Sequence, residues 1–248
     1  MPALLGSLRF VFRSLADFVF PPICYGCDEE TESGLVCGTC RLLLLTSELD
    51  VCPGCGRPCA SASDGCGLCG IPFSLERVRA LGLYQPPMRG LIHALKYSQK
   101  TVLAPLLGLA LAALAMQDTE LRSCDVVCPI PLHPARMRER GYNQSLLLAA
   151  VVSVATGIRL EQAIVRRKNT PSQTTKTSPE QRRKNLAGAF ALSKGADVRG
   201  KRVLLIDDVC TVGATLDSAG RVLLQAGTKE VMGLVVAAPG SKAPASYA

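Results

Sequence analysis

Short apolar runs alternate with stretches of helical periodicity along most of this chain. Uniformly apolar runs between turn residues are typical of buried strands, and apolar residues spaced three and four apart are typical of helices. We therefore expect strands at 78–84, 126–130, 160–165, 189–192, 203–207 and 231–237. Helices are expected around residues 88–95, 102–117, 146–155 and 217–225. Because strands that alternate with helices form parallel sheets, the sequence predicts an α/β fold with helices on both faces.

The N-terminal segment 1–21 has a helical pattern of its own. Its apolar side chains recur at Leu4, Leu8, Phe12, Leu15 and Val19. Charged residues interrupt it, which argues against a removable signal peptide and favours an amphipathic helix docked on the protein rather than inserted in lipid. The other apolar stretch, 102–117, is too short to span a bilayer. We expect a cytoplasmic protein without membrane insertion.

Cysteine is concentrated near the N-terminus. Nine of the twelve cysteines lie between residues 24 and 69, and eight of them form four Cys-x-x-Cys pairs. The paired residues are Cys24, Cys27, Cys37, Cys40, Cys52, Cys55, Cys66 and Cys69. Each pair can present two thiolates from a tight knuckle, so two pairs complete a tetrahedral Cys₄ zinc site. Such a site has no open coordination position, so its zinc is structural.

Several features of this module stay open at the level of sequence. Disulfides and an iron–sulfur cluster are alternatives to zinc, although a reducing compartment disfavours disulfides. The pairs can combine sequentially or in an interleaved cross-brace, with one or two zinc ions. Cys59 has no partner in the pattern, whereas Cys124, Cys128 and Cys210 lie in or beside apolar strands and are expected to be core thiols.

Charge and chain length refine this picture. The chain has 248 residues and a net charge of +8, and residues 133–184 contain eleven lysines and arginines against three acidic residues. The rest of the chain is therefore neutral, and any polyanionic partner should meet this segment. We expect four parts: the helix at 1–21, a small Cys-rich zinc module at 22–72, the α/β domain at 73–240 and a disordered tail at 241–248.

The strand at 203–207 ends in two adjacent carboxylates and is followed by a small, hydroxyl-bearing turn. Asp207 and Asp208 lie at the end of the strand, and the turn at 211–215 leads into a helix. The first turn of a helix offers unsatisfied N–H groups and the positive end of the helix dipole to an anion. The sequence therefore predicts a ligand with a phosphate and vicinal hydroxyls.

A second candidate binding segment follows the strand at 126–130. Residues 129–144 begin with two prolines and carry Arg136, Arg138 and Arg140. Ligands in parallel sheets bind beyond the carboxyl ends of the strands, so this loop should lie near the aspartates. Alternate arginines on a rigid loop can point the same way, and planar guanidinium groups suit a diphosphate. His133 contacts phosphate or caps the turn.

The motif at 203–215 resembles the 5-phosphoribosyl 1-diphosphate (PRPP) motif of type I phosphoribosyltransferases. That resemblance assigns the ribose hydroxyls to Asp207 and Asp208. It assigns the 5′-phosphate to Thr211, Gly213, Ala214 and Thr215. Val212 departs from the pattern, because the family usually has Thr or Ser there. The loss of one hydroxyl donor should weaken the phosphate site without abolishing it.

A wider set of motifs resembles the ComF/GntX family of competence-associated, phosphoribosyltransferase-like proteins, over about residues 20 to 237. These motifs are the cysteine knuckles, Leu95-Lys96-Tyr97, Pro129-Ile-Pro-Leu-His133, Arg140-Gly-Tyr-Asn-Gln144, Asn169-Thr-Pro-Ser-Gln173, Arg183-Lys-Asn185 and Ala189-Phe190. The resemblance implies a type I phosphoribosyltransferase-like domain at 73–240, a pyrophosphate loop at 129–144 and a mobile flap at 168–184.

Two functions follow as hypotheses. The first is an enzyme that binds PRPP with magnesium and transfers the phosphoribosyl group to an acceptor that the sequence does not identify. The second is a non-catalytic factor in DNA uptake (natural transformation), in which the zinc module and the basic segment hold single-stranded DNA. The scarcity of aromatic side chains in the basic segment argues against the second. The catalytic residue and the oligomeric state stay unassigned.

Overall fold

The computed structural model describes residues 22–31, 34–46, 49–53, 55–59, 73–169, 186 and 188–240. The expected N-terminal helix at 1–21, the tail at 241–248 and nearly all of the expected flap at 168–184 lie outside these residues. The same is true of Cys66 and Cys69.

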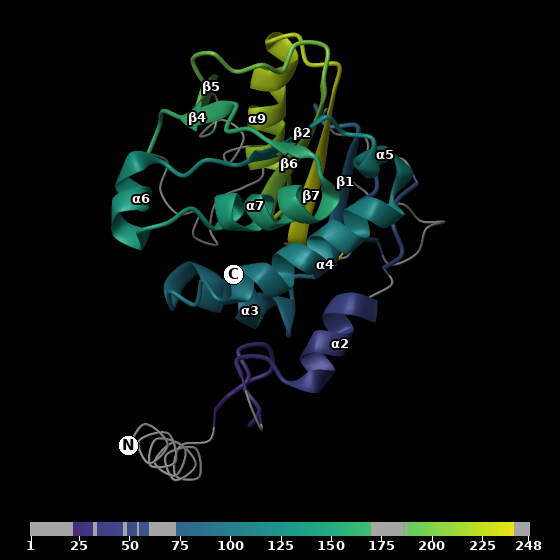
Figure 1. Cartoon of the computed structure of the whole chain (residues 1–248), viewed down its shortest axis with the longest axis vertical. Helices are drawn as coiled ribbons and strands as arrows, with labels where there is room; N and C mark the ends of the chain where they lie inside the picture. Colours follow the sequence, from purple (N-terminus) through teal and green to yellow (C-terminus); the bar gives the residue numbers. More distant parts are fainter. Residues whose placement is uncertain are drawn as a thin grey trace, which may run out of the picture.

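A parallel sheet of five strands forms the centre of the molecule (Figure 1). In spatial order its strands are β1 (Arg77–Leu83), β7 (Glu230–Ala238), β6 (Arg202–Val209), β2 (Val126–Pro129) and β3 (Arg159–Leu160). Every neighbouring pair is parallel. The central strands β6 and β7 are buried along nearly their whole length, which explains their apolar sequences. The predicted fold class is confirmed.

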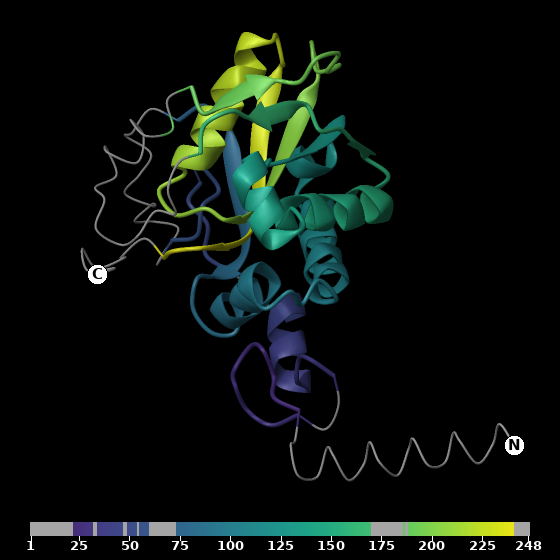
Figure 2. The same cartoon turned by 90° about the vertical axis from the view of Figure 1, so that its left-hand side faces the viewer.

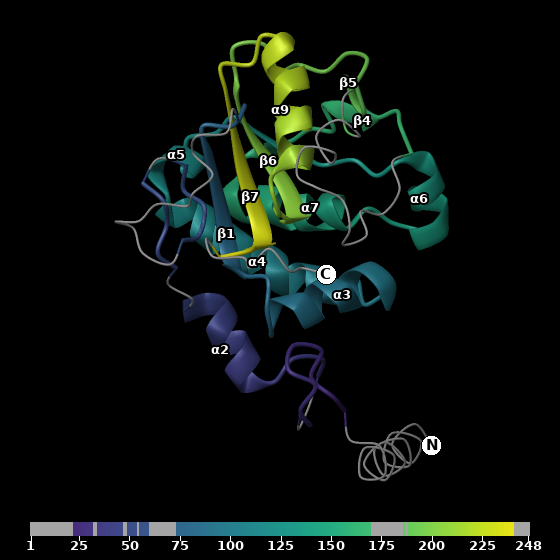
Figure 3. The same ribbon diagram turned by 180° about the vertical axis from the view of Figure 1, so that it is seen from behind.

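Helices cover both faces of this sheet (Figure 3). One face carries α3 (Met88–Tyr97), α4 (Leu103–Gln117) and α7 (Gln144–Thr156), and the other carries α9 (Ala214–Gln225). The side chains of β6 alternate between them: Leu204 and Ile206 join the core under α4 and α7, whereas Val203 and Leu205 join the core under α9. A short helix, α5 (Thr119–Arg122), follows α4.

The expected strand at 160–165 is wrong as a single element. Arg159 and Leu160 pair with β2 as β3, and the chain then leaves the sheet. Residues Ile164–Arg166 form β4, which pairs antiparallel with β5 (Phe190–Leu192) in a separate ribbon beside α9. The apolar residues on the two sides of Glu161 and Gln162 therefore belong to two different sheets.

The expected loop at 129–144 contains a helix, α6 (Pro134–Arg140). His133 begins it, because the Nδ1 atom of His133 accepts a hydrogen bond from the Ala135 N–H at 3.2 Å. Pro134 occupies the first turn, where a missing N–H costs nothing, and Gly141 ends the helix in the left-handed conformation. These local signals explain why a stretch without apolar periodicity is helical.

The N-terminal cysteine loops and α2 (Gly38–Thr46) pack against α3 and α4 at one end of the molecule (Figures 1 and 2). Cys24, Cys40 and Leu44 share a core with residues of both helices. Contact is close at Gly90, where an added Cβ would lie 2.2 Å from the Tyr25 carbonyl oxygen. A side chain at position 90 would therefore separate the module from α3.

The described residues include no helix with the length and apolar character needed to cross a membrane.

Candidate functional site

The two aspartates lie near the carboxyl end of β6 and are held by α3 and α7. Pro129 pairs with Ile206, so the segment after β2 starts beside Asp207. The Ser145 hydroxyl donates to Asp207 at 2.9 Å, and the Gln144 amide donates to Asp208 at 2.7 Å. The Lys96 ammonium lies 2.7 Å from the other carboxylate oxygen of Asp208. Both carboxylates are therefore fixed by donors from neighbouring helices.

The electrostatics of this pair are those of a buried anionic site. Burial and, to a smaller extent, the neighbouring Asp208 carboxylate raise the pKa of Asp207 to about 7. For Lys96, burial acts to lower the pKa, but the Asp208 and Asp207 carboxylates together outweigh it and raise the pKa. The Lys96 ammonium thus pairs with Asp208, and the Arg166 guanidinium lies close enough to interact with the Asp207 carboxylate.

The three arginines of the expected pyrophosphate loop divide between two sides of α6. Arg136 and Arg140 line a cavity of about 120 Å³ together with Lys96, Tyr97, Gln99 and Glu139. Arg138 is exposed and does not line this cavity. Residues two apart on a helix point in nearly opposite directions. The expectation that all three point the same way is therefore wrong, because it assumed an extended loop.

Arg140 is also tied to the aspartates. Its guanidinium hydrogen-bonds to the side chain of Gln144, whose amide holds Asp208. It also lies 5.4 Å from the centroid of the Tyr97 ring. Arg140, Gln144 and Asp208 thus form a continuous chain from the cavity to the end of β6.

The turn between β6 and α9 has the form of an anion cradle. Gly213 occupies the N-cap position with φ of 79°, and no side chain caps the helix. Ala214 is buried, Thr215 is half-buried and Thr211 is exposed. Val212 packs against the core under α9, which accounts for an apolar residue where a hydroxyl was expected. The first N–H groups of α9 therefore have no side-chain cap among the described residues, which is the arrangement of an anion site at a helix N-terminus.

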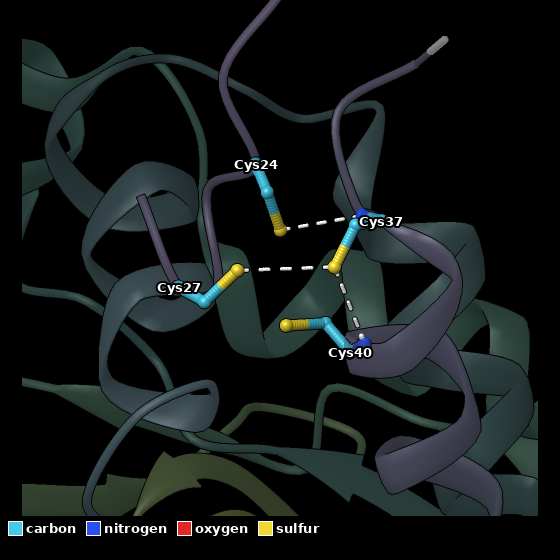
Figure 4. A group of neighbouring side chains, drawn as sticks. All are labelled: Cys24, Cys27, Cys37 and Cys40. Carbon is cyan, nitrogen blue, oxygen red and sulfur yellow. Dashed lines mark hydrogen bonds between the residues drawn. The ribbon is translucent and has the colours of Figure 1, made fainter. Parts of the chain in front are cut away.

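The first cysteine group, Cys24, Cys27, Cys37 and Cys40, converges on one point (Figure 4). All four sulfur atoms lie within 4.8 Å of one another, and the Cys27 and Cys37 sulfurs are 3.8 Å apart. Tetrahedral zinc with Zn–S bonds of about 2.3 Å requires sulfur separations of about 3.8 Å. This geometry fits zinc and favours sequential pairing over the cross-brace.

Backbone N–H groups support these sulfurs. Gly26 and Cys37 donate to the Cys24 sulfur at 3.3 Å each, and Cys40 donates to the Cys37 sulfur at 3.4 Å. Burial acts to raise the pKa of the Cys24 thiol, but these backbone donors outweigh it and lower the pKa to about 6. Cys24 is thus prepared to bind a metal as a thiolate.

The second cysteine group is described only in part. Cys52 and Cys55 lie together with Cys59, while their expected partners Cys66 and Cys69 fall outside the described residues. The knuckle at 52–57 is docked on β1, because the Val78 N–H donates to the Cys55 carbonyl at 2.8 Å. This part of the module is therefore attached to the edge of the main sheet.

The remaining cysteines are buried, as expected. Burial raises the pKa of Cys124, Cys128 and Cys210 to about 12 in each case. Thiols with such pKa values are poor nucleophiles.

Sequence reasoning missed several residues of the site. Lys96 was noted only within a resemblance, and Gln144 was the end of a motif, yet both contact Asp208. Arg166 was counted only as charge, although burial lowers its pKa and the Asp207 carboxylate opposes this effect. No periodicity identifies these residues, because they come from separate elements that only the fold brings together.

Comparisons with known proteins agree with this architecture. Residues 143–248 match the family model of the phosphoribosyl transferase domain, and residues 15–76 match that of the double zinc ribbon domain. The chain is 31% identical over 217 residues to the DNA utilization protein YhgH of Escherichia coli K12, covering 85% of this chain and 94% of that protein. It is 31% identical over 216 residues to Competence protein F of Haemophilus influenzae, with 84% and 87% covered.

The chain belongs to the ComF family. Competence protein ComFC of Bacillus subtilis is similar as well, at 28% identity over 201 residues that cover 77% of this chain and 79% of that protein. The main domain of this ComF-family protein is phosphoribosyltransferase-like, and its N-terminal module is a zinc ribbon that carries a cysteine cluster suited to structural zinc.

Proposed function

We propose that the protein binds PRPP with magnesium at the carboxyl end of β6 and transfers its phosphoribosyl group to an acceptor. The observation that carries this proposal is the buried pair Asp207 and Asp208 beside the uncapped N-terminus of α9. The two carboxylates suit ribose hydroxyls and a hard cation, and the helix N-terminus suits a phosphate.

Each group has a distinct role in this proposal. Asp207 and Asp208 accept hydrogen bonds from the ribose hydroxyls, while the turn at 211–215 binds the 5′-phosphate through its N–H groups and the hydroxyls of Thr211 and Thr215. Arg136 and Arg140 face the diphosphate from the cavity at α6. Magnesium, when bound, would neutralise the diphosphate beside the ribose hydroxyls. Fixed cations at the leaving pyrophosphate stabilise charge that develops as the bond to C1′ breaks.

Zinc holds the module together in this account. We propose one ion at Cys24, Cys27, Cys37 and Cys40, and a second at Cys52, Cys55, Cys66 and Cys69. The cysteines need a reducing compartment to stay available as thiolates, in keeping with a cytoplasmic location. Neither ion takes part in the chemistry, because thiolates fill every coordination position.

Isothermal titration of PRPP with magnesium tests the ribose assignment. The double variant Asp207→Asn/Asp208→Asn should lose measurable binding, because neutral amides cannot replace two carboxylates that hold a cation and hydroxyl groups. Asp197→Asn is the matched control, since Asp197 is exposed and pairs with Lys201 before the amino end of β6, the end of the strand opposite to the aspartates. Binding that is equal in the wild type and the double variant would rule out this function.

A second candidate is a role in handling single-stranded DNA. Relatives of this chain are named DNA utilization and competence proteins. The structure adds an exposed aromatic ring: Tyr97 is 59% exposed and lies beside Arg140, an arrangement on which a base can stack. The exposed Arg138 is available to contact phosphates in the same region.

Salt dependence of oligonucleotide binding tests this candidate. Contacts to several phosphates release counterions, so the affinity for a labelled single strand should fall steeply as salt rises. Replacing Arg136, Arg138 and Arg140 should flatten this slope, and Tyr97→Ala should weaken binding without changing the slope. Oligonucleotide binding that does not depend on salt, or on these arginines, would exclude a role in handling single-stranded DNA.

A further inference from the structure

Arg57 is a buried cation of the cysteine module. It lies between Cys55 and Cys59 in the sequence and is only 6% exposed. The Nε and Nη2 atoms have no hydrogen-bond partner among the described residues. The guanidinium carbon is 4.1 Å from the centroid of the Phe73 ring. A ring face offsets part of the charge, but two buried guanidinium nitrogens without acceptors are costly.

The backbone around Arg57 is fixed at both ends. The Cys52 N–H donates to the Arg57 carbonyl at 2.8 Å, and Val51 and Pro58 form an isolated antiparallel bridge. The Cys55 carbonyl accepts from Val78 at the start of β1. The buried position of Arg57 is therefore set by the knuckle and by its attachment to the main sheet.

The guanidinium faces the turn that precedes α9. A Cβ added to Gly213 would lie 2.9 Å from the Nη2 atom of Arg57 and 2.7 Å from the Phe73 ring. Gly213 is the N-cap of α9, a helix of 12 residues without a side-chain cap. Two positive groups, the cation and the positive end of the helix, thus meet at one place. The acidic residue in the first turn of α9, Asp217, is engaged elsewhere, by the Ser74 N–H and by Arg221.

We propose that Arg57 is a phosphate-binding residue. It is a residue of the zinc ribbon that lies at the anion site at the N-terminus of α9. Its ligand is the 5′-phosphate of the phosphosugar, so this inference rests on the proposed function and deepens it. A phosphate group supplies the acceptors that the buried guanidinium lacks and the charge that the helix terminus attracts. The knuckle at 52–57 is then part of the ligand site as well as a structural unit.

Calorimetric titration of the full-length, zinc-loaded protein tests this assignment with ribose 5-phosphate and with pyrophosphate. Arg57→Met should bind ribose 5-phosphate about ten- to a hundredfold more weakly, the loss that follows from one hydrogen-bonded charge. Its affinity for pyrophosphate, which lacks the 5′-phosphate and faces α6, should stay within about twofold of wild type. Arg41→Met, an exposed arginine on α2 of the same module, should change neither affinity.

Zinc content and thermal unfolding are measured on each variant first. If Arg57→Met does not fold, Arg57→Lys decides, since it keeps the charge but loses the planar fork and should weaken ribose 5-phosphate binding several-fold. Unchanged ribose 5-phosphate binding in the folded variant, or an equal loss for both ligands, would overturn the role of Arg57. A wild-type protein that binds no ribose 5-phosphate would overturn it too.

The two proposals fail differently in this experiment. If ribose 5-phosphate binding depends on Arg57 but PRPP binding is indifferent to Asp207→Asn/Asp208→Asn, the phosphate site stands and the proposed function falls. If PRPP binding needs the aspartates but not Arg57, the proposed function stands and the present inference falls.

Discussion

Lys96 is the cation on which the two buried aspartates depend. Its ammonium lies 2.7 Å from Asp208, and its side chain is 20% exposed. Replacement by methionine keeps the length of the side chain and removes the charge. Breaking a buried pair by removing one partner costs about 3–5 kcal/mol, and the partial exposure of Lys96 places the expected loss near the lower end. We therefore expect Lys96→Met to lower the free energy of unfolding by about 3 kcal/mol at pH 8.

This loss should depend on pH in a defined direction. Lys96 acts to lower the pKa of Asp207, which is about 7 in the folded wild type, so Lys96→Met raises this pKa and a proton takes the place of the missing ammonium above pH 7. Where the folded variant binds one proton more than the wild type, its relative stability rises by about 1.4 kcal/mol for each unit that the pH falls. The difference between the two proteins should therefore shrink between pH 8 and pH 6.

Urea unfolding in buffer without magnesium or phosphate measures both effects. Lys194→Met serves as the matched control, because Lys194 is exposed and lies in a turn between β5 and β6, before the amino end of β6. Its effect should stay within about 0.5 kcal/mol at either pH. A loss below about 1 kcal/mol for Lys96→Met at pH 8, or a loss that is the same at both pH values, would refute the reasoning.

Three further predictions follow from the site. Magnesium-dependent PRPP binding needs ionised Asp207, whose pKa is about 7, so calorimetry should show affinity falling up to about tenfold per unit below pH 7; a pH-independent affinity would contradict this. Gly213→Ala should lower the free energy of unfolding by about 1–3 kcal/mol. The loss should be clearly larger than for Gly157→Ala, where an added Cβ meets nothing within 4 Å. Equal losses for the two variants in urea unfolding would contradict the close contact at Gly213. Cys27→Ser should reduce the zinc measured by atomic emission by one ion per chain relative to Cys124→Ser, and unchanged zinc would contradict the Cys₄ assignment.

The central strands and their aspartates could be predicted from the sequence because each depends on local chemistry. Buried parallel strands such as β6 need a continuous apolar run, and the acids at its end are adjacent in sequence. The turn before α9 was identifiable for the same reason. A small N-cap with a positive φ leaves a visible signature in the sequence.

The rest of the site depends on contacts between distant elements. Lys96 and Asp208 are separated by more than a hundred residues, and Arg57 and Gly213 by more than a hundred and fifty. No spacing rule connects such positions. The helix α6 was missed because its stability comes from the cap at His133 and the stop at Gly141 rather than from apolar periodicity, and this error misplaced Arg138.

The most direct test of this account is a crystal structure of the zinc-loaded protein grown with PRPP and magnesium. We expect the ribose hydroxyls within hydrogen-bond distance of Asp207 and Asp208, and the 5′-phosphate on the N–H groups of residues 211–215. A phosphosugar bound elsewhere, or a turn before α9 that stays without phosphate while PRPP is present in excess, would contradict the account.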